Sequence, residues 1–223
     1  TLFRSGISGI FDTRGTRAYS RELIVHINDA QAHRGPDEHD VHLEPGLALG
    51  HRRLSVIDLA AGQQPLFNQA GTVGIVFNGE IYNYRDLTDE LKALGYHFRT
   101  RSDTEVIVHA WSAWGEACVH RLRGMFAFVV WDTKTNEMYG ARDIFGIKPF
   151  YYTQTDAGEL LFGSEIKSLL EHPGFRREVN AEALRPYLTF QYSAMNETFF
   201  KGTYKLAPAH WFEYKDGQMH IER

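Results

Sequence analysis

The chain has 223 residues, of which 43% are hydrophobic, so it can bury the core of one large domain or of two small ones. Its 24 basic and 28 acidic residues give a net charge of −4, which provides no positive field for nucleic acid or an anionic membrane. The sequence contains no run of 18 apolar residues and no signal-peptide pattern, and a single cysteine, Cys118, excludes an internal disulfide. These features are typical of a cytoplasmic globular protein.

Three segments carry apolar residues at helical spacing. The first, residues 21–34, repeats them every three or four positions. The second, residues 84–94, has the same spacing and is followed by Gly95 as a helix cap. The third begins at residues 102–105 (SDTE), which predict a capping box, and continues to Trp114.

Short β-branched or aromatic runs bounded by turn residues predict strands. They are residues 6–12, 47–52, 73–77, 125–131, 137–142, 150–153 and 160–164. Several of these strands follow one another without a helix between them, which favours antiparallel sheets and a layered α+β fold. Residues 211–223 predict a hairpin that stops abruptly, so we expect this chain to be a domain taken from a longer protein.

Seven motifs follow one another along the chain. They are SGISGIFD (5–12), HRGPD (33–37), HRRLSVID (51–58), NGEIYN (78–83), SDTEV (102–106), RGMFAF (123–128) and RDIFGIKP (142–149). In their order and spacing they resemble the class II glutamine amidotransferases, and NGEIYN is similar to the asparagine synthetase branch of that family. The likeness covers nearly the whole chain.

This resemblance implies a fold and a domain organisation. We expect the N-terminal-nucleophile hydrolase fold, an α+β four-layer αββα sandwich of two antiparallel sheets between helical layers. Residues 5–223 are expected to form one glutamine amidotransferase domain behind a leader of residues 1–4, with the C-terminal synthetase domain absent. In such enzymes ammonia from glutamine passes to a carboxylate that the synthetase domain activates with ATP.

Release of ammonia from a glutamine side chain needs a nucleophile, a base and hydrogen-bond donors for the developing oxyanion. The resemblance places the nucleophile at Ser5, where the family has a cysteine whose own α-amine is the base. It places the oxyanion hole at the Asn78 side chain and the Gly79 backbone N–H. Taken alone, Asn-Gly is also the strongest signal for a hairpin turn, and this alternative stands beside the catalytic one.

Holding glutamine requires a cation for its α-carboxylate and an acid for its α-ammonium. The resemblance favours Arg53 for the carboxylate over Arg52, and neighbouring strand residues face opposite sides, so only one of the two should enter the pocket. Asp103, with Glu80 nearby, is expected to bind the ammonium, although an acid in the first turn also suits a helix dipole. The remaining residues expected to line the pocket are Leu54, Val56 and Ile57.

Other reactive residue types point to structural roles. Several histidines and acids could be grouped into a metal site, but their spacing matches no common ligand pattern, and none is predicted. These residues are His33, His39, His42, Asp37 and Asp40. We expect Arg34 and Asp37 to be ion-pair members under the pocket and Cys118 to be an inert buried thiol. No phosphate-binding glycine loop occurs, so ATP and magnesium are expected only in the absent synthetase domain.

Ser5 sets the expected function. A hydroxyl is much harder to ionise than a thiol, whose pKa is about 8.5, and Arg4 makes the Ser5 nitrogen an amide that cannot act as a base. We therefore expect the glutaminase domain of an asparagine synthetase-like amidotransferase, impaired in the printed form, which binds L-glutamine and works with a C-terminal or partner synthetase domain. The alternative is a non-catalytic glutamine-binding or scaffold domain that regulates a synthetase partner. A homodimer stays open.

Overall fold

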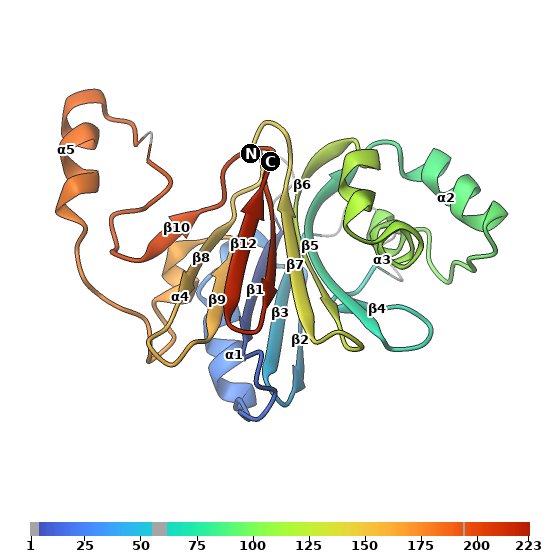
Figure 1. Cartoon of the computed structure of the whole chain (residues 1–223), viewed down its shortest axis with the longest axis horizontal. Coiled ribbons are helices and arrows are strands. Elements are labelled where there is room, and N and C mark those ends of the chain that lie inside the picture. The colour runs from blue at the N-terminus through green and yellow to red at the C-terminus, as the bar shows by residue number, and fades with distance from the viewer. Residues whose placement is uncertain (1–4, 55–61, 194) are drawn as a thin grey trace.

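The molecule is a layered sandwich, seen in a computed structural model that describes residues 5–54, 62–193 and 195–223. Two antiparallel sheets stand face to face, and helices cover the outer face of each (Figure 1). The predicted four-layer αββα arrangement is therefore confirmed. Neither sheet is exposed on its inner face, where the aromatic side chains Phe11, Phe162 and Phe212 are fully buried.

The first sheet has the strand order β10-β8-β9-β1-β3-β2, with antiparallel pairing throughout. Its strands are β1 (Gly6–Phe11), β2 (Glu38–Glu44), β3 (Leu47–Arg53), β8 (Tyr151–Gln154), β9 (Leu160–Gly163) and β10 (Thr203–Lys205). All six residues of β1 are buried, and the strand lies between β9 and β3. Ser5 therefore directly precedes a central, buried strand.

The second sheet has the strand order β12-β11-β7-β6-β5-β4, also antiparallel. Its strands are β4 (Leu66–Phe67), β5 (Val73–Ile81), β6 (Gly124–Asp132), β7 (Glu137–Arg142), β11 (Trp211–Lys215) and β12 (Gln218–Glu222). The predicted C-terminal hairpin corresponds to β11 and β12. The edge strand β4 pairs only with Ile75 and Gly74, so the C-terminal half of β5 extends beyond it.

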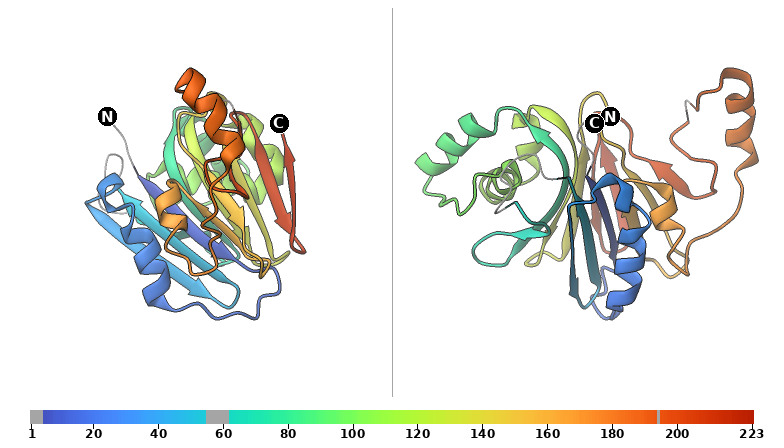
Figure 2. Two further views of the ribbon diagram at one scale, coloured as in Figure 1. Left: turned by 90° about the vertical axis from the view of Figure 1, so that its left-hand side faces the viewer. Right: turned by 180° about the vertical axis from the view of Figure 1, so that it is seen from behind.

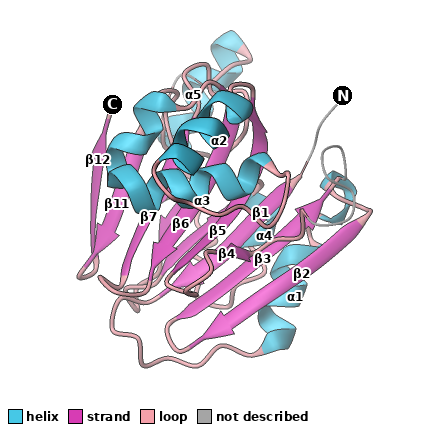
Figure 3. Cartoon of the chain, turned by 90° about the vertical axis from the view of Figure 1, so that its right-hand side faces the viewer, coloured by secondary structure: helices cyan, strands magenta, loops and turns pink. Residues whose placement is uncertain are grey.

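The helices lie on the two outer faces. Helices α1 (Arg21–Asp29) and α4 (Ile166–Leu169) pack on the first sheet, and α2 (Tyr84–Ala93) and α3 (Asp103–Trp114) cover the second (Figure 3). The helix expected over residues 21–34 is shorter, because α1 ends at Asp29 and a separate 3₁₀ turn follows over Ala32–Arg34. Helix α5 (Ala181–Phe190) stands away from the sandwich (Figure 2).

Two local predictions need correction. Asn78 and Gly79 do not form a hairpin turn, since they lie inside β5 and pair with Ala127 and Phe126 of β6. At the start of α3 the hydroxyl of Ser102 accepts the Thr104 N–H (3.1 Å), as an N-cap does. The second half of the predicted capping box is absent.

The carboxylate that was expected to complete this box has other partners. Glu105 accepts the N–H groups of Arg99 (2.9 Å) and Thr100 (2.7 Å), and the Ser102 N–H donates to the Thr100 hydroxyl (3.2 Å). The acid thus orders the loop before α3 and leaves the cap to Ser102 alone.

Cys118 is fully buried in the 3₁₀ helix Gly115–Arg121, and burial raises the pKa of its thiol to about 12. This agrees with the expected inert thiol. Among the described helices, none has the length and apolar character needed to cross a membrane.

Candidate active site

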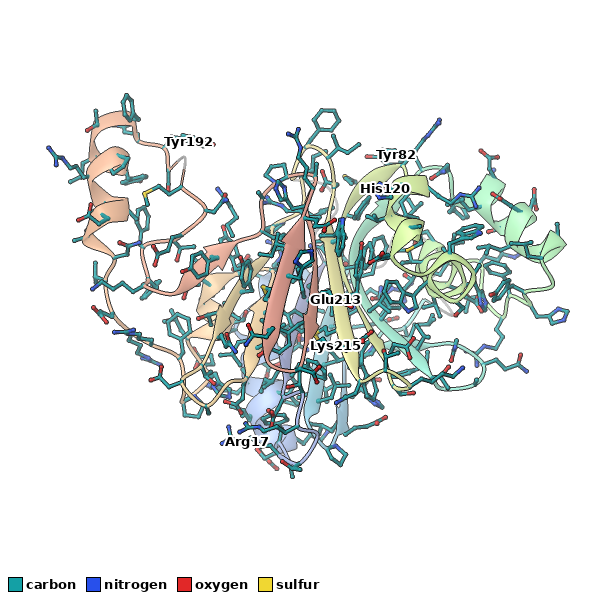
Figure 4. All side chains as sticks on the ribbon, in the orientation of Figure 1. Arg17, Tyr82, His120, Tyr192, Glu213 and Lys215 are labelled. Atoms are coloured by element: carbon teal, nitrogen blue, oxygen red, sulfur yellow. The ribbon has the colours of Figure 1, made fainter. Side chains whose placement is uncertain are left out.

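A polar pocket lies where β1 and β3 of the first sheet meet β5 and the beginning of α3. Its lining residues are Ser5, His51, Arg53, Leu54, Gly62, Gln64, Phe77, Asn78, Gly79, Glu80, Ser102, Asp103, Thr104 and Lys148. The structure thus brings together seven of the nine residues predicted for the site. The other two, Val56 and Ile57, lie outside the described residues. Figure 4 shows Tyr82, which directly follows β5, on the side of the molecule opposite the α5 segment that ends near Tyr192.

Ser5 lines this pocket and is held by main-chain and side-chain contacts. Its N–H donates to Asn78 Oδ1 (3.3 Å), and its hydroxyl oxygen accepts the Leu54 N–H (3.4 Å). The Ser5 carbonyl accepts Arg34 Nε (2.9 Å), and the same guanidinium pairs with Glu165 (2.9 Å). Arg34 is therefore a structural ion-pair member that fixes the backbone of Ser5.

Two neighbouring residues of β5, Asn78 and Gly79, line the pocket together with Ser5. The Asn78 side chain is 1% exposed, and its Nδ2 has no hydrogen-bond partner within the described part of the chain. Leaving a buried donor unsatisfied costs about 1–3 kcal/mol, which a ligand oxygen can recover. At Gly79 any Cβ would lie 2.2 Å from the Met125 carbonyl oxygen, so only glycine fits this position.

The direction of the Gly79 N–H follows from strand alternation. The Phe77 N–H donates to Gln64 Oε1 (2.6 Å) and the Ile81 N–H donates to Asp103 Oδ2 (2.9 Å), both on the edge of β5 away from β6. Alternate residues of an antiparallel strand direct their N–H groups to the same side. The Gly79 N–H therefore faces this edge, between two side chains that line the pocket.

Charged side chains also line the pocket. Arg53, whose side chain is 7% exposed, lines it and pairs with Glu38 (2.7 Å). Its neighbour Arg52 turns away and contacts the Asn28 carbonyl and the Asp29 carboxylate. This opposite orientation is the one that strand alternation predicts.

Asp103, the first residue of α3, is 5% exposed and lines the same pocket as Glu80. Burial raises the pKa of the Asp103 carboxyl to about 6, and the charge of Glu80 contributes in the same direction. An ammonium ion bound here would lower the pKa of Asp103 again, because a positive charge stabilises the ionised carboxylate.

Seven lining residues escaped the sequence analysis as site residues, among them His51, Lys148 and Gln64. The buried His51 donates from Nε2 to the Phe77 carbonyl (3.0 Å), and burial lowers its pKa to about 4, so the ring is neutral at pH 7. Lys148 is 5% exposed, and burial lowers the pKa of its ammonium. His51 and Lys148 stand inside HRRLSVID and RDIFGIKP, which gave a signal for them, whereas Gln64 belongs to none of the seven motifs.

The histidines considered for a metal site lie apart from this pocket. His33 contacts Glu165 (2.9 Å) and His42 contacts Glu44 (2.9 Å) at the surface. In the described ranges, no group of three or more His, Cys, Asp or Glu side chains is arranged to hold a metal ion.

Comparison with known proteins identifies the family of this chain. The glutamine amidotransferase domain family matches residues 4–223. Asparagine synthetase [glutamine-hydrolyzing] 3 of Bacillus subtilis (strain 168) is 40% identical over 216 residues, which are 95% of this chain and 35% of that protein. Asparagine synthetase [glutamine-hydrolyzing] 1 of the same organism is 41% identical, with 96% of this chain and 34% of that protein covered. The chain thus spans about a third of the length of these relatives.

Among solved structures, the glutamine phosphoribosylpyrophosphate amidotransferase of B. subtilis, complexed with ADP and GMP, superimposes with a TM-score of 0.69. The alignment has 19% sequence identity and covers 98% of this chain and 49% of that chain, which supports the shared fold. The family match over residues 4–223 and the relatives at 40% and 41% identity carry the assignment: the chain belongs to the glutamine amidotransferase domain family.

Proposed function

We propose that the pocket binds L-glutamine and that this domain is the glutaminase part of an asparagine synthetase-type amidotransferase. The names of the relatives and the order of the motifs support this assignment. Because the chain spans about a third of those relatives, the carboxylate acceptor, ATP and magnesium are assigned to a further synthetase domain. L-Glutamine is then the substrate that the present domain handles.

Two groups of lining residues suit the two ends of glutamine; we call them the charged end of the pocket (Arg53, Glu80 and Asp103) and its reacting end (Ser5, Asn78 and Gly79). Arg53 binds the α-carboxylate, for which a guanidinium offers paired donors, and Asp103 with Glu80 binds the α-ammonium. The side-chain amide then extends toward Ser5. The observation that carries the proposal is the buried Asn78 Nδ2, which has no hydrogen-bond partner among the described residues and belongs to the amide that contacts Ser5.

The geometry supports acyl transfer. The nucleophile at position 5 attacks the amide carbon, and the negative charge that develops on the carbonyl oxygen is held by Asn78 Nδ2 and the Gly79 N–H. Collapse of the tetrahedral intermediate breaks the C–N bond, and the nitrogen leaves as ammonia after it takes a proton. Water then hydrolyses the acyl-enzyme to glutamate and frees the nucleophile.

In the printed chain this reaction is impaired at its first step. Ser5 provides a hydroxyl in place of a thiol, and the hydroxyl is far harder to ionise. The nitrogen of Ser5 is bonded to Arg4, so it is an amide whose lone pair is delocalised into the Arg4 carbonyl and cannot take up the proton. It donates to Asn78 Oδ1, and it cannot accept a proton from the nucleophile.

The Ser5 hydroxyl and the amide nitrogen of Ser5 also favour a second candidate function. In it, the domain binds glutamine without hydrolysing it and regulates a synthetase partner. The charged end of the pocket is built independently of Ser5, since Arg53, Glu80 and Asp103 come from β3, β5 and α3. Binding therefore does not require the reactive group.

The deciding experiment compares ammonia release from glutamine by three forms of the chain. They are the printed chain, residues 5–223 with Ser5 kept, and residues 5–223 with Ser5→Cys. Loss of a catalytic nucleophile costs up to about 10⁶ in kcat, so the Ser5→Cys form should exceed the printed chain by at least about a thousandfold. The form that keeps Ser5 separates the effect of the free amine from that of the thiol. A Ser5→Cys form no faster than the printed chain, but able to bind glutamine, would favour the binding domain.

A further inference from the structure

The edge of β5 beyond β4 carries a short row of backbone N–H groups. β4 begins at Leu66, which pairs with Ile75, so within the described residues no strand lies opposite the later residues of β5 on this side. The N–H groups of Phe77, Gly79 and Ile81 all point to this edge by alternation. Buried backbone donors need acceptors, and here side chains supply those that a neighbouring strand would otherwise supply.

The acceptor for Phe77 is Gln64, a side chain that is only 7% exposed. Its Oε1 accepts the Phe77 N–H at 2.6 Å, the shorter of the two side-chain bonds on this edge. Its Nε2 donates to the hydroxyl of Thr104 (3.2 Å), so both ends of the amide are engaged. The carboxamide of Gln64 thus takes the place of a peptide group from a missing strand.

The contact between Gln64 and Thr104 connects the proposed oxyanion hole at Gly79 with the proposed ammonium site at Asp103. Thr104 follows Asp103 at the beginning of α3, and Asp103 accepts the Ile81 N–H from the same edge. Gln64 and Asp103 therefore bracket Gly79 along β5, and Thr104 links the two through α3. The outer two N–H groups of the row bind protein oxygens, and the middle one is directed to the pocket.

We propose that Gln64 is a positioning residue for the oxyanion hole. It fixes the plane of the β5 backbone two residues before Gly79, and through Thr104 it sets that backbone relative to the helix that carries Asp103. This inference rests on the proposed glutaminase function. Gln64 touches no reacting atom, so its removal affects the reaction through the Gly79 N–H.

The test uses three variants. Gln64→Met keeps the length of the side chain but removes the amide, whereas Gln64→Glu keeps an oxygen for the Phe77 N–H and lets the Thr104 hydroxyl rotate to donate. The matched control is Gln63→Met at the exposed neighbouring glutamine. In residues 5–223 with Ser5→Cys, we expect Gln64→Met to lower kcat by about tenfold to a hundredfold with KM changed by less than about threefold. Gln64→Glu should restore most of kcat, and Gln63→Met should retain it.

A second measurement needs no turnover. Amide hydrogen exchange in the printed chain should become at least about tenfold faster at Phe77 and Gly79 in Gln64→Met, and stay near the parent value in Gln64→Glu. If the Ser5→Cys form releases no ammonia, the proposed glutaminase function is wrong. The exchange measurement still tests Gln64 in that case, because unchanged exchange at Phe77 and Gly79 would overturn its positioning role. An unchanged kcat in Gln64→Met, or a fall in kcat, KM and thermal stability that Gln64→Glu does not reverse, would also overturn it.

Discussion

The reacting end and the charged end of the pocket are built in different ways. At the reacting end, Ser5 directly precedes β1, and the donors of Asn78 and Gly79 come from β5 of the other sheet. Their contribution depends on neutral N–H groups whose directions are fixed by strand alternation. At the charged end, Arg53 and Asp103 are nearly buried ionisable side chains, and each contacts a protein group.

This difference separates catalysis from affinity. In the proposed reaction the reacting end depends on one covalent feature, a nucleophile with a free amine, and either a substitution at position 5 or an added leader removes it. The charged end depends on electrostatics that persist whether or not position 5 can react. The proposed function thus implies that turnover can be lost while glutamine still binds, and the three predictions below test this division.

The largest effect is expected at Asn78. In residues 5–223 with Ser5→Cys, Asn78→Ala should lower kcat by about 10²–10³, as loss of one oxyanion donor does, while KM changes far less. Steady-state ammonia release measures both constants. Asn83→Ala is the matched control, because Asn83 belongs to the same NGEIYN motif but bonds Arg121 and Arg123 instead. A raised KM at constant kcat would instead assign Asn78 to ground-state binding.

A smaller effect is expected at the charged end, and it should appear in binding. In residues 5–223, Arg53→Ala and Asp103→Ala should each weaken glutamine binding by about tenfold to a hundredfold, the loss typical of a charge-assisted hydrogen bond. Calorimetric titration measures this without turnover. Arg52→Ala is the control, since Arg52 faces Asn28 and Asp29. Loss of affinity in Arg52→Ala, with Arg53→Ala unaffected, would reverse the assignment.

The smallest effect is a pH dependence of affinity. Burial raises the pKa of Asp103 to about 6, so the carboxyl is charged above pH 7 and becomes neutral as the pH falls through 6. Only the charged form attracts an α-ammonium, and we expect glutamine affinity to fall by up to about tenfold per unit below pH 6. Asp103→Asn should bind weakly with little change between pH 5 and 7. A parent titration that is flat over this range would remove Asp103 from the ammonium site.

The sequence alone determined the local parts of this protein. The Ser102 cap and the amphipathic spacing before Gly95 predicted α3 and α2, because caps and helical faces depend on residues a few positions apart. Most strands were predicted near their observed bounds, and the ordered motifs identified the family. The sequence missed β2, whose residues are mostly polar and half-exposed at a sheet edge, and it missed the short β4 and β10.

Tertiary structure decided how these parts meet. Asn78-Gly79 has the sequence of a turn, yet pairing with Ala127 and Phe126 keeps it in a strand, because long-range hydrogen bonds outweigh a dipeptide preference. Glu105 has the spacing of a capping box, but nearer loop amides engage its carboxylate. Gln64 gave no local signal, since its role arises only where a short β4 leaves the edge of β5 open beside α3. A pocket that joins two sheets and a helix is fixed by packing between distant segments, which local sequence preferences do not encode.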